Sequence, residues 1–295
     1  MRTAFWESVA AEGFRVPEDA ALDELTAELV SMLGDPDPHV RDELGATMLS
    51  TWVAEGIYDE LLSGLGDGLA MGLRSRLGEN GTDSVLRRSY SAAVLTAVVA
   101  RDNAVGLLHP TTVLTWADRG VAWLLGERDL RGFVPQRGWA HAAAHGADLL
   151  GTLAASRHLG ADELAVLLDV VADRLLAATP HRLVDGEPDR LAFATMSLLH
   201  RDLVTGDVVE PWVDRLTDGW SGANRPQPGQ RVTPVCQNTV GFVRALHLQL
   251  LLGVVSTPTH DTAGTLLGNP ALRGDLLIAL QRALRTSAPW MYRSG

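Results

Sequence analysis

The pentapeptide Asp37-Pro38-His39-Val40-Arg41 is followed about 46 residues later by Asp83-Ser84-Val85-Leu86-Arg87. In both, a short polar residue or a proline leads into a polar or charged residue and then an apolar run, a pattern typical of a helix start. Similar starts occur near Arg137, Pro188 and Val235, so the spacing is close to 46 to 53 residues. The pattern predicts five imperfect units.

Between these starts, apolar residues recur with helical spacing, and strand-like alternation is nearly absent. Two examples are Leu22, Leu25, Leu29 and Leu33, and Leu164, Leu167, Leu168 and Val171. A period of roughly 40 to 47 residues with two helices per unit is typical of HEAT or armadillo-like proteins. We therefore expect an all-α, right-handed stack of helix pairs, an α-solenoid, that forms a single domain over residues 1–295. A non-repetitive α-bundle is the alternative.

If the stack is correct, one helix of each unit lies in an inner, concave layer, where such proteins usually bind their ligands. The expected inner helices lie near residues 38–53, 83–99, 137–156, 188–201 and 235–252.

The composition limits the classes of function. Apolar residues make up 46% of the chain, enough to bury a core. Cys236 is the only cysteine, which excludes an internal disulfide and a multi-cysteine zinc site. The formal net charge is −11 and all 25 basic residues are arginine, so the balance of charge disfavours nucleic acid as a partner. We find no signal peptide and no apolar stretch of the roughly 20 residues that span a bilayer, and we expect a cytoplasmic protein without a membrane partner.

The segment from Gly138 to Leu150 carries the residues that we expect to form a site. On a helix with about 100° per residue, His141, His145 and Asp148 lie at about 0°, 40° and −20°, on one face. Two histidines at i and i+4 are spaced to bind zinc, and a carboxylate three residues later can ligate the metal or orient a histidine. The sequence predicts one divalent metal ion, Zn, Fe or Mn, at these residues. A metal-free pocket and a purely structural hydrogen-bond network stay open.

A charged loop precedes this segment. Glu127, Asp129 and Arg131 lie before Gly132 and Pro135, and the loop can reach back to the following helix. Glu127 or Asp129 is therefore the expected general base or a further metal ligand, and a solvated charged turn is the alternative. The glutamate that directly follows the first histidine in zinc proteases is missing, which disfavours a protease of that type.

Other polar residues on the expected inner layer are candidates for ligand binding. Arginine there can hold a carboxylate or a phosphate through two hydrogen bonds, or can lock neighbouring repeats by pairing with acids. Trp139 adjoins the histidines and would form a pocket wall, whereas Trp52, Trp116 and Trp123 are expected in the core. The candidates for substrate binding are Arg88, Arg131, Trp139, His200 and Asn238.

Some familiar motifs are absent or incomplete. The glycine-rich run Gly64-Leu-Gly66-Asp-Gly68 has no preceding strand, so it resembles a phosphate-binding loop only superficially. The sequence has no P-loop and no Gly-x-Ser-x-Gly nucleophile elbow. Cys236 could be a nucleophile, but a lone buried cysteine more often only packs in the core.

Four motifs resemble a family of bacterial proteins catalogued as domain of unknown function 2785. They are Gly126-Glu-Arg-Asp-Leu-Arg-Gly-Phe133, Gly138-Trp-Ala-His-Ala-Ala-Ala-His-Gly-Ala-Asp-Leu-Leu150, Arg88-Ser-Tyr-Ser91 and Asn238-Thr-Val-Gly-Phe242. The likeness extends from Phe5-Trp6 to the helix ending near Leu252. It implies one domain of helical repeats and singles out the same histidine segment, but it implies no catalytic roles.

Two main functions remain. The first is a metal-dependent hydrolase in which His141, His145 and an acid hold an ion that activates water to attack a small molecule or a peptide. The second is a non-catalytic scaffold whose concave face binds a peptide, a protein or a small ligand. A homodimer is also open, because the tail Trp290-Met-Tyr292 would dock either on its own chain or on a partner.

Overall fold

The computed structural model of the chain describes residues 2–255, 266 and 268–292. Almost all of its regular structure is helical, which confirms the expected all-α class. The chain forms two compact units, Met1–Leu149 and Leu150–Gly295, and each is described by itself. The single domain over residues 1–295 stays a prediction.

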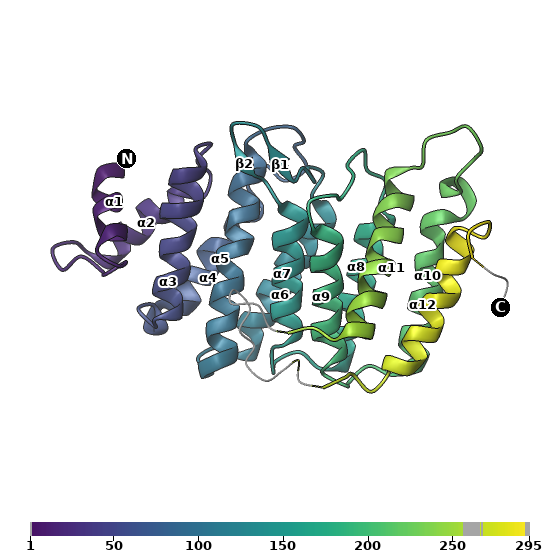
Figure 1. Ribbon diagram of the computed structural model, residues 1–295. Coiled ribbons are helices and arrows are strands. Elements are labelled where there is room, and N and C mark those ends of the chain that lie inside the picture. Colours follow the sequence, from purple (N-terminus) through teal and green to yellow (C-terminus); the bar gives the residue numbers. More distant parts are fainter. Residues whose placement is uncertain (1, 256–265, 267, 293–295) are drawn as a thin grey trace. The chain divides into compact units, whose positions relative to one another are not determined.

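In the described residues, the first unit contains six α-helices, one π-helix, one short 3₁₀ helix and a small hairpin, and α7 begins in it and ends in the second unit (Figure 1). They are α1 (Thr3–Ala11), α2 (Leu22–Met32), the π-helix η1 (His39–Ala46), α3 (Thr47–Ala54), the short η2 (Asp59–Leu61), α4 (Leu62–Gly72), α5 (Ser84–Val105), α6 (Pro110–Gly126), β1 (Phe133–Val134), β2 (Gly138–Trp139) and α7 (Ala142–Ala154). Here α3 packs on α5, α4 packs on α6, and α4 also packs on α5.

The second unit is also built from helices that pack on one another. Its elements are α8 (Ala161–Leu176), α9 (Glu187–Leu199), α10 (Gly206–Leu216), the short η3 (Thr217–Trp220) and η4 (Gly222–Asn224), α11 (Pro234–Leu252) and α12 (Arg273–Ser287). Helix α10 packs against both α8 and α12, while α9 packs against α11, its neighbour in Figure 1. Within the described residues, none of the helices has the length and apolar character needed to cross a membrane.

The apolar periodicity read from the sequence corresponds to buried helix faces. Leu25, Leu29 and Leu33 are fully buried, and Leu164, Leu167, Leu168 and Val171 form the buried stripe of α8. Trp52, Trp116 and Trp123 lie in the core as expected.

The helix expected near residues 137–156 begins later than predicted. Residues 133–139 form a hairpin instead, in which Phe133 pairs with Trp139 and Val134 with Gly138. Gln136 and Gly138 have φ angles of 65° and 71°, a left-handed conformation that turns the chain but cannot continue a right-handed helix. Helix α7 therefore begins only at Ala142.

The glycine-rich run of the sequence lies within helix α4. Gly64 and Gly68 are exposed on this helix, whereas Gly66 is buried against the indole of Trp116 on α6. A Cβ atom at Gly66 would overlap that ring, but no atom lies within 4 Å of a Cβ built at Gly64 or at Gly68. The run is thus a helix contact and not a phosphate-binding loop.

Because Gly66 is buried and Gly64 and Gly68 are exposed, substitution by alanine should change the stability in opposite directions at these positions. Gly66→Ala should lower the free energy of unfolding by about 1 to 3 kcal/mol, because the added methyl group overpacks the contact with Trp116. Gly64→Ala and Gly68→Ala, the matched controls, should raise it by about 0.5 to 1 kcal/mol, because alanine favours the helix. Urea denaturation of the three variants measures these changes. Equal effects at all three positions would contradict the packing of α4 on α6.

At the start of η1, His39 joins two acidic side chains. Its Nδ1 lies 2.8 Å from Glu43 Oε2, and its Nε2 lies 3.3 Å from Glu7 Oε1 on α1. Hydrogen bonding to Glu43, and then to Glu7, raises the pKa of His39 above its ordinary value of 6.5. Because this pKa is higher in the folded chain, the interaction stabilises the fold fully below about pH 6.5 and is lost as the pH rises through the folded value.

An NMR titration of the His39 ring should therefore give a pKa above 6.5. The variant Glu43→Gln should lower that pKa, since it removes the principal partner, while Glu12→Gln, directly after α1, should leave it unchanged. A pKa for His39 that does not respond to Glu43→Gln would refute this assignment.

Candidate functional site

A buried ion pair joins α5 and the segment before it to the end of α6. Arg88 Nε lies 2.6 Å from Glu127 Oε2 and Arg88 Nη2 lies 2.8 Å from Glu127 Oε1, and both side chains are inaccessible to solvent. Arg88 Nη1 also donates to the carbonyl oxygens of Ser75 and Arg76 at 2.9 and 3.1 Å. Arg88 therefore fastens the segment after α4 to the end of α6.

The Glu127 carboxylate receives further hydrogen bonds. Trp123 Nε1 donates to Oε2 at 3.1 Å, and the backbone N–H groups of Arg128 and Asp129 donate to Oε1 at 3.0 Å each. A buried carboxylate that accepts so many hydrogen bonds has no free access to a substrate proton. These contacts give Glu127 a structural role and leave it without the access that a general base needs.

Asp129 has a similar environment. Arg131 donates to both of its oxygens, at 2.8 and 2.6 Å, and the backbone N–H of Gly81 donates at 2.9 Å. Arg131 Nη2 also donates to the carbonyl of Thr82 at 2.8 Å. Asp129, predicted as a catalytic base, and Arg131, predicted as a substrate ligand, thus bind each other. Together they connect loop 127–131 to the turn before α5.

His141 and His145 are brought together, but not on one helix face. His141 directly precedes α7 with a φ of 48°, a conformation that non-glycine residues rarely adopt, and its carbonyl accepts a hydrogen bond from the His145 N–H at 2.9 Å. The two rings are 5.9 Å apart, edge to face. Asp148 follows on α7 and is half-buried.

Aromatic side chains surround the two histidines. The Trp139 indole stacks on the His141 ring with centroids 4.1 Å apart, and Tyr90 meets His145 edge-on at 5.0 Å. Nδ1 of His145 lies 2.9 Å from Oγ of Ser89, a fully buried side chain on α5. These contacts attach the β1–β2 hairpin to α5.

The geometry gives the predicted metal site little support. In the part of the chain that the structure describes, no group of three or more His, Cys, Asp or Glu side chains is placed to hold a metal ion. Asp148, the expected third ligand, forms no such group with the two histidines in the described residues. Glu127 and Asp129, the expected general bases or further ligands, are paired with Arg88 and Arg131. The donor set that a divalent ion requires is therefore not assembled around His141 and His145.

The two remaining candidates lie in the second unit. Asn238 is buried on α11, where it accepts a hydrogen bond from the Leu183 N–H at 2.9 Å and donates to the His181 carbonyl at 3.1 Å. It thereby fixes the segment before α9. His200 ends α9 and lies 2.8 Å from the carbonyl oxygen of Met196. Both side chains contact backbone and are not directed at a common ligand.

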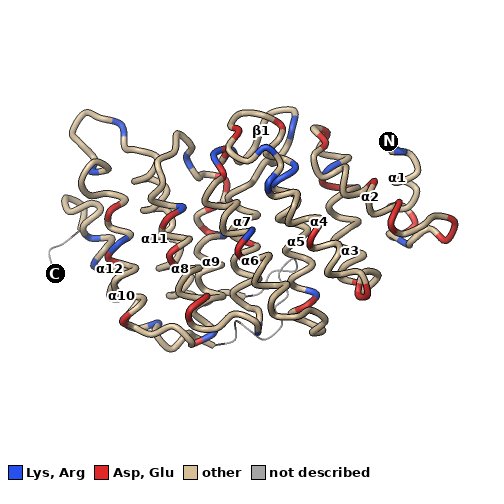
Figure 2. Tube along the Cα trace, turned by 180° about the vertical axis from the view of Figure 1, so that it is seen from behind, with Lys and Arg blue, Asp and Glu red and all other residues tan. Residues whose placement is uncertain are grey.

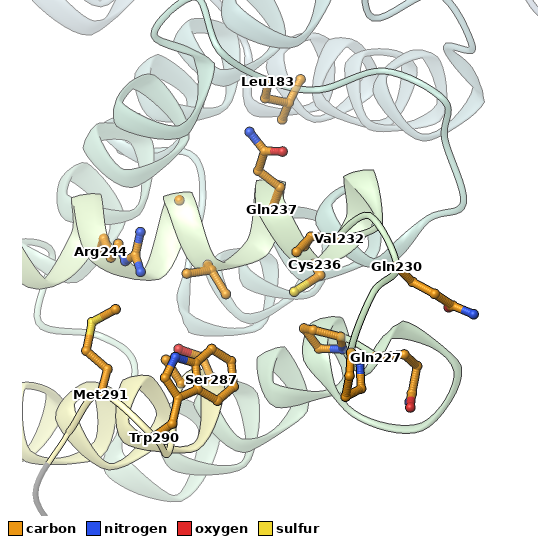
Figure 3. A pocket seen from close by; sticks show the side chains of 15 residues that line it. Leu183, Gln227, Gln230, Val232, Cys236, Gln237, Arg244, Ser287, Trp290 and Met291 are labelled. Carbon is orange, nitrogen blue, oxygen red and sulfur yellow. The ribbon is translucent and has the colours of Figure 1, made fainter.

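The second unit contains a pocket that the sequence analysis did not predict. Its volume is about 720 Å³, within the range of about 300 to 1,000 Å³ that is usual for small-molecule sites. Four segments form it, namely Leu183 before α9, residues 226–232 before α11, one face of α11, and residues 287–291 at the end of α12 and after it (Figure 3). Its lining is Leu183, Pro226, Gln227, Pro228, Gln230, Val232, Cys236, Gln237, Val240, Gly241, Arg244, Ser287, Ala288, Trp290 and Met291.

Most of this lining is apolar. Leu183, Cys236 and Ala288 are buried in the walls, whereas Trp290 and Met291 are 75% and 64% exposed and leave the pocket open to solvent. Burial raises the pKa of the Cys236 thiol, so the thiol is protonated at neutral pH and contributes an apolar surface. Trp290 and Met291 of the tail expected to dock, and the lone cysteine, thus line this pocket.

The buried pair in the first unit leads to a stability prediction. Arg88→Met should lower the free energy of unfolding by about 3 to 5 kcal/mol, because it leaves the Glu127 carboxylate buried without its partner. The same substitution at Arg137, whose ion pair with Asp83 spans 3.0 Å between side chains 40% and 47% exposed, should cost less than about 1 kcal/mol. Guanidinium denaturation compares the two.

A double variant provides the second control. Glu127→Leu added to Arg88→Met removes the unpaired charge and should recover part of the lost stability. If Arg88→Met cost no more than Arg137→Met, the structural role given to the pair would be wrong.

The comparisons with known proteins give a family without an assigned activity. Residues 73–248 match the model of the family described as "Protein of unknown function (DUF2785)", and this region contains all four sequence motifs given above. A search of curated proteins and a search of solved structures found no significant match. Since the match covers more than half of the chain, this protein belongs to the family of unknown function DUF2785.

Proposed function

We propose that this protein is a non-catalytic binding module, and that it binds a small, largely apolar ligand in the pocket of its second unit. The observation that carries the proposal is the pocket itself, a cavity of about 720 Å³ with apolar walls and a few polar groups. That combination of volume and lining is typical of small-molecule sites. Binding there needs no catalytic group.

We also propose that the scaffold is a stack of helix pairs of the HEAT or armadillo kind. Contacts between alternate helices support this, because α8, α10 and α12 pack in one series and α9 and α11 in another. A comparable alternation relates α3 to α5 and α4 to α6. In such stacks each pair buries its apolar face against its neighbours.

A metal-dependent hydrolase is the weaker proposal. It requires His141 and His145 to share an ion with a carboxylate, and a base within reach of the attacking water. Asp148, the expected carboxylate ligand, forms no metal-binding group with the two histidines in the described residues, and the expected bases Glu127 and Asp129 are held in ion pairs with arginine. The rings of both histidines also pack in an aromatic cluster with Tyr90 and Trp139.

Titration with N-phenyl-1-naphthylamine, a neutral apolar dye that fluoresces in apolar surroundings, tests the proposed pocket. We expect saturable binding of one dye per chain. Val240→Trp should weaken it at least tenfold, because the indole fills the pocket between α11 and the residues after α12.

Leu248→Trp is the matched control, since Leu248 is on the same helix, is 52% exposed and does not line the pocket. Its dye affinity should equal that of the unchanged chain. Absence of saturable binding, or an equal loss in both variants, would overturn the proposed function.

A further inference from the structure

We infer that the pocket of the second unit selects an apolar molecule that carries a carboxylate, and that Arg244 binds this group. The inference rests on the proposed function and specifies its ligand. It follows from the charge of the pocket, the state of Arg244 and the arrangement of polar groups along α11.

The pocket is basic in an acidic protein. The chain has a formal net charge of −11, yet no Asp or Glu occurs from Gly219 to Val255, while Arg225, Arg231 and Arg244 do. None of the residues lining the pocket is acidic. In Figure 2 the segment that leads from η3 to α11 carries arginine and no carboxylate. The local field therefore attracts anions, although the whole chain repels them.

Arg244 differs from the arginines that form ion pairs within the scaffold. Arg88, Arg131 and Arg215 each form ion pairs with an acid. Within the described residues, Arg244 has no acidic side chain within ion-pair distance and no side-chain hydrogen bond, and it is exposed at the pocket. Its guanidinium group is thus available to a ligand, and its planar fork matches the two oxygens of a carboxylate.

The polar groups are spaced along one face of α11. Gln237 and Arg244 are seven residues apart, so they are separated by two helical turns, or roughly 10 Å, and point to the same side. Between them lie Val240 and Gly241, which leave an apolar floor. Figure 3 places Arg244 and Met291 near one end of the pocket and Gln227 and Gln230 near the other.

This arrangement suits an elongated amphipathic ligand. Its apolar body would lie on Val240 against Trp290 and Met291, and its carboxylate would meet Arg244. Exposed ion pairs are weak in water, but apolar walls exclude part of the solvent and strengthen a paired hydrogen bond to a carboxylate. The pocket therefore distinguishes a carboxylate from an uncharged or cationic analogue of the same apolar length.

Displacement of N-phenyl-1-naphthylamine by three ligands of equal chain length tests this specificity. The ligands are dodecanoate, dodecanamide and dodecylammonium, each used below the concentration at which it forms micelles. We expect dodecanoate to displace the dye at a concentration at least tenfold lower than either analogue. Arg244→Gln should remove this preference while leaving dye binding within about twofold, because the dye is neutral.

Arg285→Gln is the matched control, since Arg285 is an exposed arginine on α12 that does not line the pocket. The variant should keep the full preference for dodecanoate. Dye binding with equal displacement by all three ligands would overturn the inference and leave the proposed function intact. Failure of the dye to bind would overturn both.

Discussion

The structure depends on the burial of one apolar stripe of each helix against other helices. Most helices here have fewer than 20 residues and gain their stability from packing and not from intrinsic propensity. Helix α8 shows the pattern, because its stripe from Leu164 to Leu175 faces inward. Alternate helices supply the partner surfaces, as α9 does for α11 and α8 for α10. Where two helices approach closely, only a small residue fits between them. Gly66 of α4, which lies against Trp116 of α6, is the clearest case.

Polar groups inside such a scaffold must be paired. This requirement explains why the two acids predicted as catalytic form ion pairs instead. Glu127 and Asp129 accept hydrogen bonds from Arg88 and Arg131, so burial of their charge is compensated. Asn238 likewise satisfies backbone groups near Leu183. An arginine that lines an apolar pocket and has no acidic partner in the described residues departs from this pattern of pairing. Arg244 is that residue, and it directs attention to the pocket.

The sequence predicted the features that depend on local chemistry. Helix starts near residues 38, 83, 188 and 235 follow from caps and periodicity, and the structure places helices at His39, Ser84, Glu187 and Pro234. It did not predict the left-handed conformation of His141 or the hairpin before it, because these depend on packing against Tyr90 of α5. Nor did it predict the pocket. The walls of the pocket come from residues as distant in sequence as Leu183 and Met291, and each of them taken alone resembles a core residue or part of the tail. The absence of acids from Gly219 to Val255 was the available signal.

The pocket beside α11 is the proposed ligand site. The most direct measurement is a set of isotope-edited NMR contacts between bound dodecanoate and the labelled protein. We expect nuclear Overhauser effects from the alkyl protons to the methyl groups of Val240 and Met291 and to the indole of Trp290, with the carboxylate end nearest Arg244. Contacts confined to residues outside this pocket, or no contacts at saturating dodecanoate, would contradict it.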